Sequence, residues 1–133
     1  MRHKSEAKQW IEFADKDLAL AEHTAKTMRP TPHEIVCYHC QQFAEKCLKA
    51  FLVLKGQEPP CIHDLAKLAA LCEMENHDFL QIKQKCVMLT GYGVQSRYPG
   101  YMQVIEEDMV MALRLASEIK IFLLEKVPEL FRD

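Results

Sequence analysis

Apolar residues recur every three or four positions in long stretches of this chain, which is the spacing of one face of an α-helix. The first stretch ends at Pro30, and its apolar positions are Trp10, Ala14, Leu18, Ala21, Ala25 and Met28. The second lies between Pro32 and Gly56, and its positions are Val36, Cys40, Phe43, Cys47, Ala50 and Leu54. Proline suits the start of a helix and glycine the position just past its end, so these residues predict two helices.

Three further helices are predicted in the second half of the chain. A short helix covers about 63–73, and a longer one covers about 76–92 with Asn76 as its N-cap. The longer helix buries Phe79, Ile82, Cys86 and Leu89. A last helix covers about 102–126, where alternating steps of four and three give the seam Ile105, Met109, Ala112, Ala116, Ile119 and Leu123.

These patterns predict an all-α fold, an antiparallel up-and-down bundle of four long helices plus one short helix. Strand signals are absent, and glycine and proline gather in three breaks near 30–32, 56–60 and 91–100. The chain has 133 residues, which fits a single domain over 1–133.

Composition narrows the class of protein. The chain is 49% hydrophobic and 27% charged, with a net charge of −2, so it is neither disordered nor a basic protein that coats nucleic acid. No apolar stretch is long enough to span a membrane, and no signal-peptide pattern is present, so we expect a cytoplasmic protein. The six cysteines are then expected as reduced thiols that act as small apolar residues.

Two pairs of residues raise the question of a metal site. Cys37 and Cys40 share a helix face, and with Cys61 and His63 they would supply four zinc ligands. Zinc motifs usually present their ligands on turns, whereas Cys40 belongs to an apolar helix stripe. We therefore expect no metal site and no cofactor.

Polar residues form a second stripe on the predicted second helix. His39, Gln42, Lys46 and Lys49 are spaced by three, four and three, which gives either a solvated face or an anion-binding face. His63 and Asp64 come where the short helix starts, so Asp64 is a helix-start signal in its first turn. A buried His63 bonded to Asp64 or to backbone is a second interpretation.

Residues 91–101 concentrate three glycines, three tyrosines and Arg97 between two helices. Tyrosine rings offer stacking surface and a guanidinium pairs with phosphate, which suits a nucleotide or a nucleic-acid strand. The alternative is a loop that only joins two helices. The chain has no glycine-rich phosphate loop and no nucleophile elbow, so a Ser-His-Asp type of enzyme is not supported.

Together these stretches resemble the HEPN (higher eukaryotes and prokaryotes nucleotide-binding) domain family. The resemblance rests on Trp10 with residues 14–18, on residues 37–52 (CYHCQQFAEKCLKAFL), on His63-Asp64-Leu65 and on Arg97-Tyr98-Pro99. It implies a helical bundle that is often a homodimer, encoded beside a small nucleotidyltransferase in a toxin–antitoxin-like unit. Many members of the family are metal-independent ribonucleases, in which an arginine is followed after four to six residues by a histidine and two such motifs face each other across a dimer.

Here Arg97 matches the arginine, but the histidine positions hold Met102, Gln103 and Val104, which cannot relay protons at neutral pH. The chain therefore resembles an Arg-Tyr-Pro branch, for which a non-catalytic nucleotide-binding or partner-binding module is the leading hypothesis. The expected site residues are Arg97, Tyr98, Tyr101, His39, Lys46, Lys49, His63 and Asp64. The alternatives are a ribonuclease that uses Arg97 with His39 or His63, and a structural dimerisation module.

Four bulky residues lie off the main stripes of the first and last helices: Phe13, Met111, Leu115 and Phe122. A small bundle cannot turn all of them inward, and exposed apolar surface of this kind usually marks an interface. We therefore expect a C2 homodimer.

Overall fold

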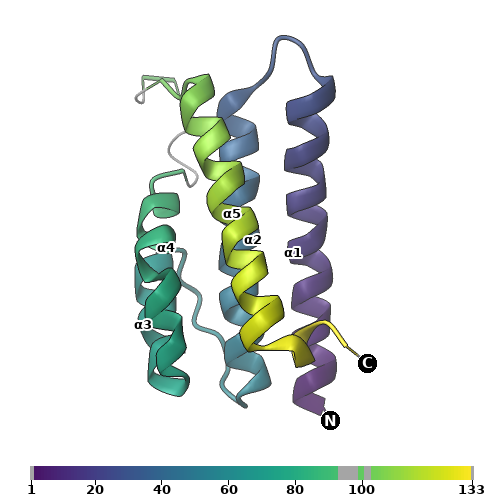
Figure 1. The fold of residues 1–133 in the computed structure, drawn as a ribbon, viewed down its shortest axis with the longest axis vertical. Coiled ribbons are helices and arrows are strands. Elements are labelled where there is room, and N and C mark those ends of the chain that lie inside the picture. Colours follow the sequence, from purple (N-terminus) through teal and green to yellow (C-terminus); the bar gives the residue numbers. More distant parts are fainter. Residues whose placement is uncertain (1, 93–98, 101–102, 133) are drawn as a thin grey trace.

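The computed structural model describes residues 2–92, 99–100 and 103–132, which form five α-helices and no β-strand (Figure 1). The α-helices are α1 (Arg2–Thr27), α2 (His33–Leu54), α3 (Leu65–Glu75), α4 (Lys83–Thr90) and α5 (Glu106–Lys126). Two 3₁₀ segments, η1 (His77–Ile82) and η3 (Pro128–Leu130), precede α4 and follow α5. The all-α prediction is confirmed.

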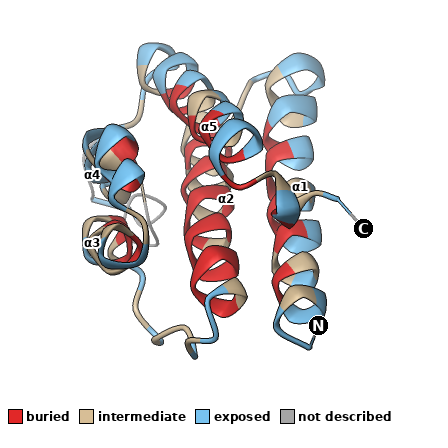
Figure 2. Cartoon of the chain, turned by 60° about the horizontal axis from the view of Figure 1, so that its bottom comes forward, coloured by how far each residue is buried: buried red, intermediate tan, exposed pale blue. Residues whose placement is uncertain are grey.

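Helix α2 is the centre of the molecule. It packs against α1, α3, α4 and α5, and Figure 2 shows buried residues along almost its whole length. A run of apolar residues on several faces, rather than on one stripe, is what a helix surrounded by other helices requires. Every other helix is therefore positioned by its contact with α2.

The helices are not a simple up-and-down bundle of four long members. Only α1, α2 and α5 are long, because the predicted helix 76–92 divides into η1 and an α4 of eight residues. Figure 1 shows α2, α3 and α5 running in the same direction, with α1 and α4 opposed to them. The reason is the ten-residue connection 55–64, which runs back along α2 before α3 begins.

Local sequence signals set several helix ends. Gly56 follows the end of α2 with a φ of +82°, in the left-handed region where glycine avoids a steric penalty. The Asp64 carboxylate accepts hydrogen bonds from Ala66 N and Lys67 N and so caps α3. Asn76 caps η1 in the same way, as the sequence predicts, although the segment that it starts is 3₁₀.

An aromatic cluster joins three elements at the end of the molecule where α2 and α5 finish. The rings of Phe51 and Phe79 lie 4.3 Å apart, and those of Phe79 and Phe122 lie 5.1 Å apart edge to face. Phe122 is thus buried, and so is Leu115, which corrects the expectation that both lie off the core. Phe13 and Met111 are exposed, as predicted, whereas Ile105 precedes α5 and is exposed rather than part of its seam.

None of the described helices has the length and apolar character needed to cross a membrane.

The cysteines behave as small apolar side chains. All six are free thiols, and only Cys61 is exposed. Burial raises the pKa of the Cys37 and Cys86 thiols to about 12, and it raises those of Cys40, Cys47 and Cys72 further. The buried thiols therefore stay protonated, which is the unreactive form.

We expect N-ethylmaleimide to label one thiol per chain at pH 7.5, and all six after denaturation. Cys61 reacts because water reaches it, and the other five are both shielded and protonated. Mass spectrometry after a short pulse measures the count, and Cys61→Ser should leave the folded chain unlabelled. A second thiol that reacts as fast as Cys61 would contradict the packing described above.

Candidate functional site

Asp17 on α1 brings together two residues of the predicted polar stripe. His39 Nδ1 lies 2.8 Å from Asp17 Oδ1, and Lys46 donates to Asp17 Oδ2. His39 and Lys46 are two helical turns apart on α2, so they share the face that meets α1. These three residues, which we call the Asp17 cluster, pair a mostly buried carboxylate with two cation-forming groups.

Glu45 on α2 organises a second group of the same kind, the Glu45 cluster. Its Oε2 accepts from Lys49 Nζ at 3.0 Å, and His63 Nδ1 lies 3.1 Å and 3.0 Å from its two oxygens. Gln41 Nε2 donates to the His63 carbonyl at 3.2 Å. The connection 55–64 is thus fastened to α2 through His63.

The members of the Glu45 cluster differ sharply in their contact with water. The side chains of Glu45 and Lys49 are 6% and 8% exposed, whereas that of His63 is 75% exposed. Glu45 contacts the imidazole at Nδ1, and most of the ring remains accessible to a molecule in solution. His63 is therefore the one of these three residues that a molecule in solution can reach.

These contacts revise the sequence interpretation. The stripe is not a uniformly solvated face, because Lys49 is buried and both lysines are paired with carboxylates. His63 is neither buried nor bonded to Asp64, since its ring turns to Glu45. Asp64 is a helix start signal, as expected, although it is the capping residue that precedes the first turn.

The segment that contains Arg97 leaves α4 beside these residues. Leu65 N donates to Thr90 Oγ1 at 3.0 Å, so the end of α4 meets the start of α3 just after His63 and Asp64. Arg97, Tyr98, Tyr101 and Met102 lie outside the described residues. The chain therefore enters the predicted loop next to the Glu45 cluster.

Tyr92 links the two ends of that loop. Its hydroxyl donates to Asp108 Oδ1 at 3.0 Å, and Asp108 Oδ2 accepts from Ile105 N at the start of α5. Burial, and then the hydrogen bond and charge of Asp108, raise the pKa of Tyr92 to about 12. This contact joins Tyr92, two residues past the end of α4, to the first turn of α5.

The zinc alternative gains no support from the described part of the chain. Cys37 and Cys40 are buried, Cys61 is exposed, and His63 is engaged by Glu45. Within that part, no group of three or more histidine, cysteine or acidic residues is placed to bind a metal ion.

Three residues of the site were missed by sequence reasoning: Asp17, Gln41 and Glu45. A local signal existed for two of them, because Gln41 and Glu45 continue to Lys49 in steps of four. A carboxylate beside an apolar stripe, with a lysine one turn away, indicates a buried ion pair. Asp17 has no lysine one turn away on its own helix, so no such signal existed for it.

Comparison with protein-family models gives a match to the HEPN domain over residues 7–127, which is most of the chain. The chain belongs to the HEPN domain family. The matched range contains both carboxylate clusters and the segment with Arg97, and membership in the family supports a nucleotide-binding or ribonuclease-like module. Neither the curated proteins nor the solved structures gave a match.

We expect Lys49→Met to destabilise this HEPN domain by about 3–5 kcal/mol, because it leaves the Glu45 carboxylate buried without its ammonium partner. Urea unfolding at pH 7 measures the free energy of unfolding. Adding Glu45→Gln to Lys49→Met should recover part of the loss, since no buried charge then remains.

Arg2→Met is the matched control, because the Arg2–Glu6 pair is largely exposed. Its effect should stay within about 0.5 kcal/mol. If Lys49→Met lowers the free energy of unfolding no more than Arg2→Met does, the buried Glu45–Lys49 pair is not needed for the stability of the fold.

The Tyr92–Asp108 contact should make stability fall in alkaline solution. The pKa of Tyr92 is about 12 in the folded protein against an ordinary 10.0. The contribution of the contact to the free energy of unfolding is therefore complete below pH 10 and is lost as the pH rises toward 12. Tyr92→Phe removes that loss, so its free energy of unfolding should decrease less than that of the wild type between pH 9 and 11. The buried thiols are common to both chains and cancel in the comparison, and parallel pH dependences would contradict this assignment.

Proposed function

We propose that this HEPN domain is a non-catalytic module that binds the phosphate of a nucleotide through Arg97. The observation that carries the proposal is the family match combined with the residues after Arg97, where Met102, Gln103 and Val104 stand in place of a histidine. A guanidinium binds phosphate through paired hydrogen bonds and keeps its proton at every physiological pH. Arg97 can therefore bind phosphate although none of the residues at the histidine positions can transfer a proton.

The remaining residues divide into two groups. Tyr98 and Tyr101 lie on the same segment as Arg97 and would stack on a base or donate to the ligand. His63 would contribute its exposed Nε2. The described contacts favour a supporting role for the others, because Lys46 and His39 share Asp17, Lys49 pairs with Glu45, and Asp64 caps α3.

We further propose that the partner of this module is a small nucleotidyltransferase, in a toxin–antitoxin-like pair. A nucleotidyltransferase takes nucleotides as substrates, so a domain that binds a nucleotide without reacting with it is suited to act together with such an enzyme. Co-purification with a nucleotidyltransferase encoded beside this chain tests the pairing, and a failure to co-purify when both are expressed together would count against it.

Isothermal titration calorimetry with ATP, GTP, CTP and UTP in turn tests the phosphate site. We expect wild-type protein to bind at least one of them, and Arg97→Ala to weaken that binding by about 10- to 100-fold, because a charge-assisted hydrogen bond contributes about 1.5–3 kcal/mol.

Arg132→Ala is the matched control, since it removes an exposed arginine in the last residues of the chain. It should leave binding unchanged. Equal binding by wild type and Arg97→Ala, or none by either, would rule out the site.

One contact favours a second candidate, a metal-independent ribonuclease. Glu45 orients the exposed His63 as a carboxylate orients a catalytic imidazole, so His63 Nε2 has the geometry to accept a proton from a ribose 2′-hydroxyl. Arg97 would then stabilise the negative charge on the non-bridging phosphate oxygens while the 2′-oxygen attacks phosphorus and the 5′-oxygen leaves, taking a proton from water or from the protonated His63.

Cleavage of a fluorescent RNA oligonucleotide in EDTA decides between the two candidates. The ribonuclease requires activity that is lost in both His63→Ala and Arg97→Ala and kept in His39→Ala, whose imidazole is engaged by Asp17. Absence of cleavage by wild-type protein favours the non-catalytic module.

A further inference from the structure

A groove on the surface of α1 combines two aromatic rings with a carboxylate. It has a volume of 440 Å³ and is lined by Glu6, Gln9, Trp10 and Phe13. Glu6 lies four positions before Trp10, and Gln9 lies four positions before Phe13, so each polar side chain neighbours one ring on the same face of the helix. Phe13 is 56% exposed, and a groove of this volume is large enough for a small molecule.

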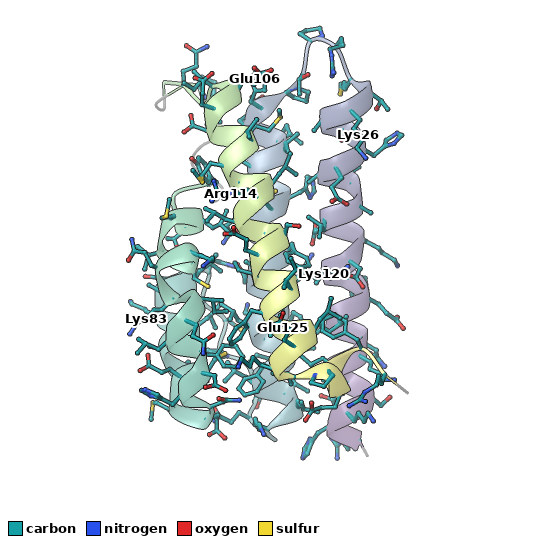
Figure 3. All side chains as sticks on the ribbon, in the orientation of Figure 1. Lys26, Lys83, Glu106, Arg114, Lys120 and Glu125 are labelled. Carbon is teal, nitrogen blue, oxygen red and sulfur yellow. The ribbon has the colours of Figure 1, made fainter. Side chains whose placement is uncertain are left out.

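Glu6 brings a weakly neutralised negative charge to this groove. On the α5 side of the same helix, Lys120 extends toward Asp15 (Figure 3), and its Nζ lies 3.2 Å from Asp15 Oδ1. Among the described residues, Glu6 pairs only with Arg2, whose Nε lies 3.7 Å from Glu6 Oε1 and whose side chain is 88% exposed. Such an exposed ion pair is weak. The described residues that line the groove include no lysine or arginine, so the groove attracts a cation and repels phosphate.

Both aromatic rings already attract ammonium groups of the protein. Lys49 Nζ lies 5.9 Å from the centroid of the Trp10 ring, and Lys16 Nζ lies 5.1 Å from that of Phe13. The negative face of an aromatic ring is the cause of this attraction. Lys49 is buried and paired with Glu45, so it stays in place. Lys16 is exposed and has no carboxylate partner within the described chain, so a cationic ligand can displace it from the Phe13 ring.

We propose that this groove binds a small organic cation with a quaternary ammonium group, such as choline. The methyl groups of the cation pack against Trp10 and Phe13, its charge lies opposite the Glu6 carboxylate, and Gln9 forms a hydrogen bond with its polar end. A quaternary ammonium suits the groove better than a primary one. It has no N–H donors, and the groove offers a single carboxylate to accept them.

This inference goes beyond the proposed nucleotide-binding function and does not rest on it. The Glu6 carboxylate disfavours phosphate, so the groove is not a second nucleotide site. The nucleotide titrations described above are a separate measurement, and either proposal can fail without the other.

The only tryptophan of the chain, Trp10, lines the groove and reports its occupation. Choline chloride is titrated at constant ionic strength, and Trp10 fluorescence and isothermal titration calorimetry follow binding in parallel. We expect saturable binding with a dissociation constant of about 1 mM. The neutral isostere 3,3-dimethylbutan-1-ol should bind at least about tenfold more weakly, because it has the same shape without the charge. Equal affinities for the two molecules, or no saturation with choline by either method, overturn the proposal.

Matched substitutions test which side chains hold the cation. Glu6→Gln removes the charge and should raise the dissociation constant of choline about threefold to fivefold, while that of the neutral isostere stays unchanged. Phe13→Leu keeps an apolar contact without a π face and should raise it about threefold. Both residues are exposed, so thermal unfolding of the variants should match that of the wild type.

Glu12→Gln is the matched control, because Glu12 is an exposed carboxylate of α1 that does not line the groove. It should leave choline binding unchanged, and so should Arg97→Ala. Equal weakening by Glu6→Gln and Glu12→Gln, wild-type affinity in Glu6→Gln, or loss of choline binding in Arg97→Ala would each place the cation outside this groove and overturn the proposal.

Discussion

The Glu45–Lys49 ion pair is the interaction on which the rest of the structure depends. Both side chains lie on the central helix, one turn apart, and almost no water reaches them. A charge in such a place is costly unless an opposite charge and further hydrogen bonds compensate it. Gln41 and His63 supply those further contacts, so the pair also fixes the connection that leads to α3.

That connection explains the order of the helices. Because residues 55–64 run back along α2, α3 starts beside the middle of α2, and α4 ends beside the start of α3. Thr90, at the end of α4, consequently lies against Leu65, two residues after His63. Tyr92 then joins the end of α4 to Asp108 at the start of α5.

The two carboxylate clusters also decide what the cations of α2 can do. Lys46 and Lys49 each form an ion pair with an acidic side chain, which largely neutralises their positive charge. A binding site for phosphate therefore depends on other groups. His63 is one of them, because its side chain is 75% exposed although Glu45 contacts its Nδ1. Membership in the HEPN family supports a nucleotide-binding or ribonuclease-like module. The proposal of binding without catalysis rests on Met102, Gln103 and Val104, which stand where a histidine would follow Arg97.

The sequence determined the helical class, most of the core and several helix ends. Apolar periodicity depends only on chain position, and the signals at Gly56, Asp64 and Asn76 act within a few residues. Periodicity also located the buried faces of α2 and α5, and the HEPN resemblance followed from residues that are contiguous in the chain.

Only the tertiary structure decided the partners of the charged residues and the direction of the helices. Asp17 meets Lys46 across 29 positions, and Glu45 meets His63 across 18, so no local spacing reveals either contact. The same holds for Leu115 and Phe122, which are buried. Phe122, for example, packs against Phe79 of η1, which lies far earlier in the chain. Periodicity says which face of a helix is apolar, but the number of neighbours around that helix depends on how the whole chain packs.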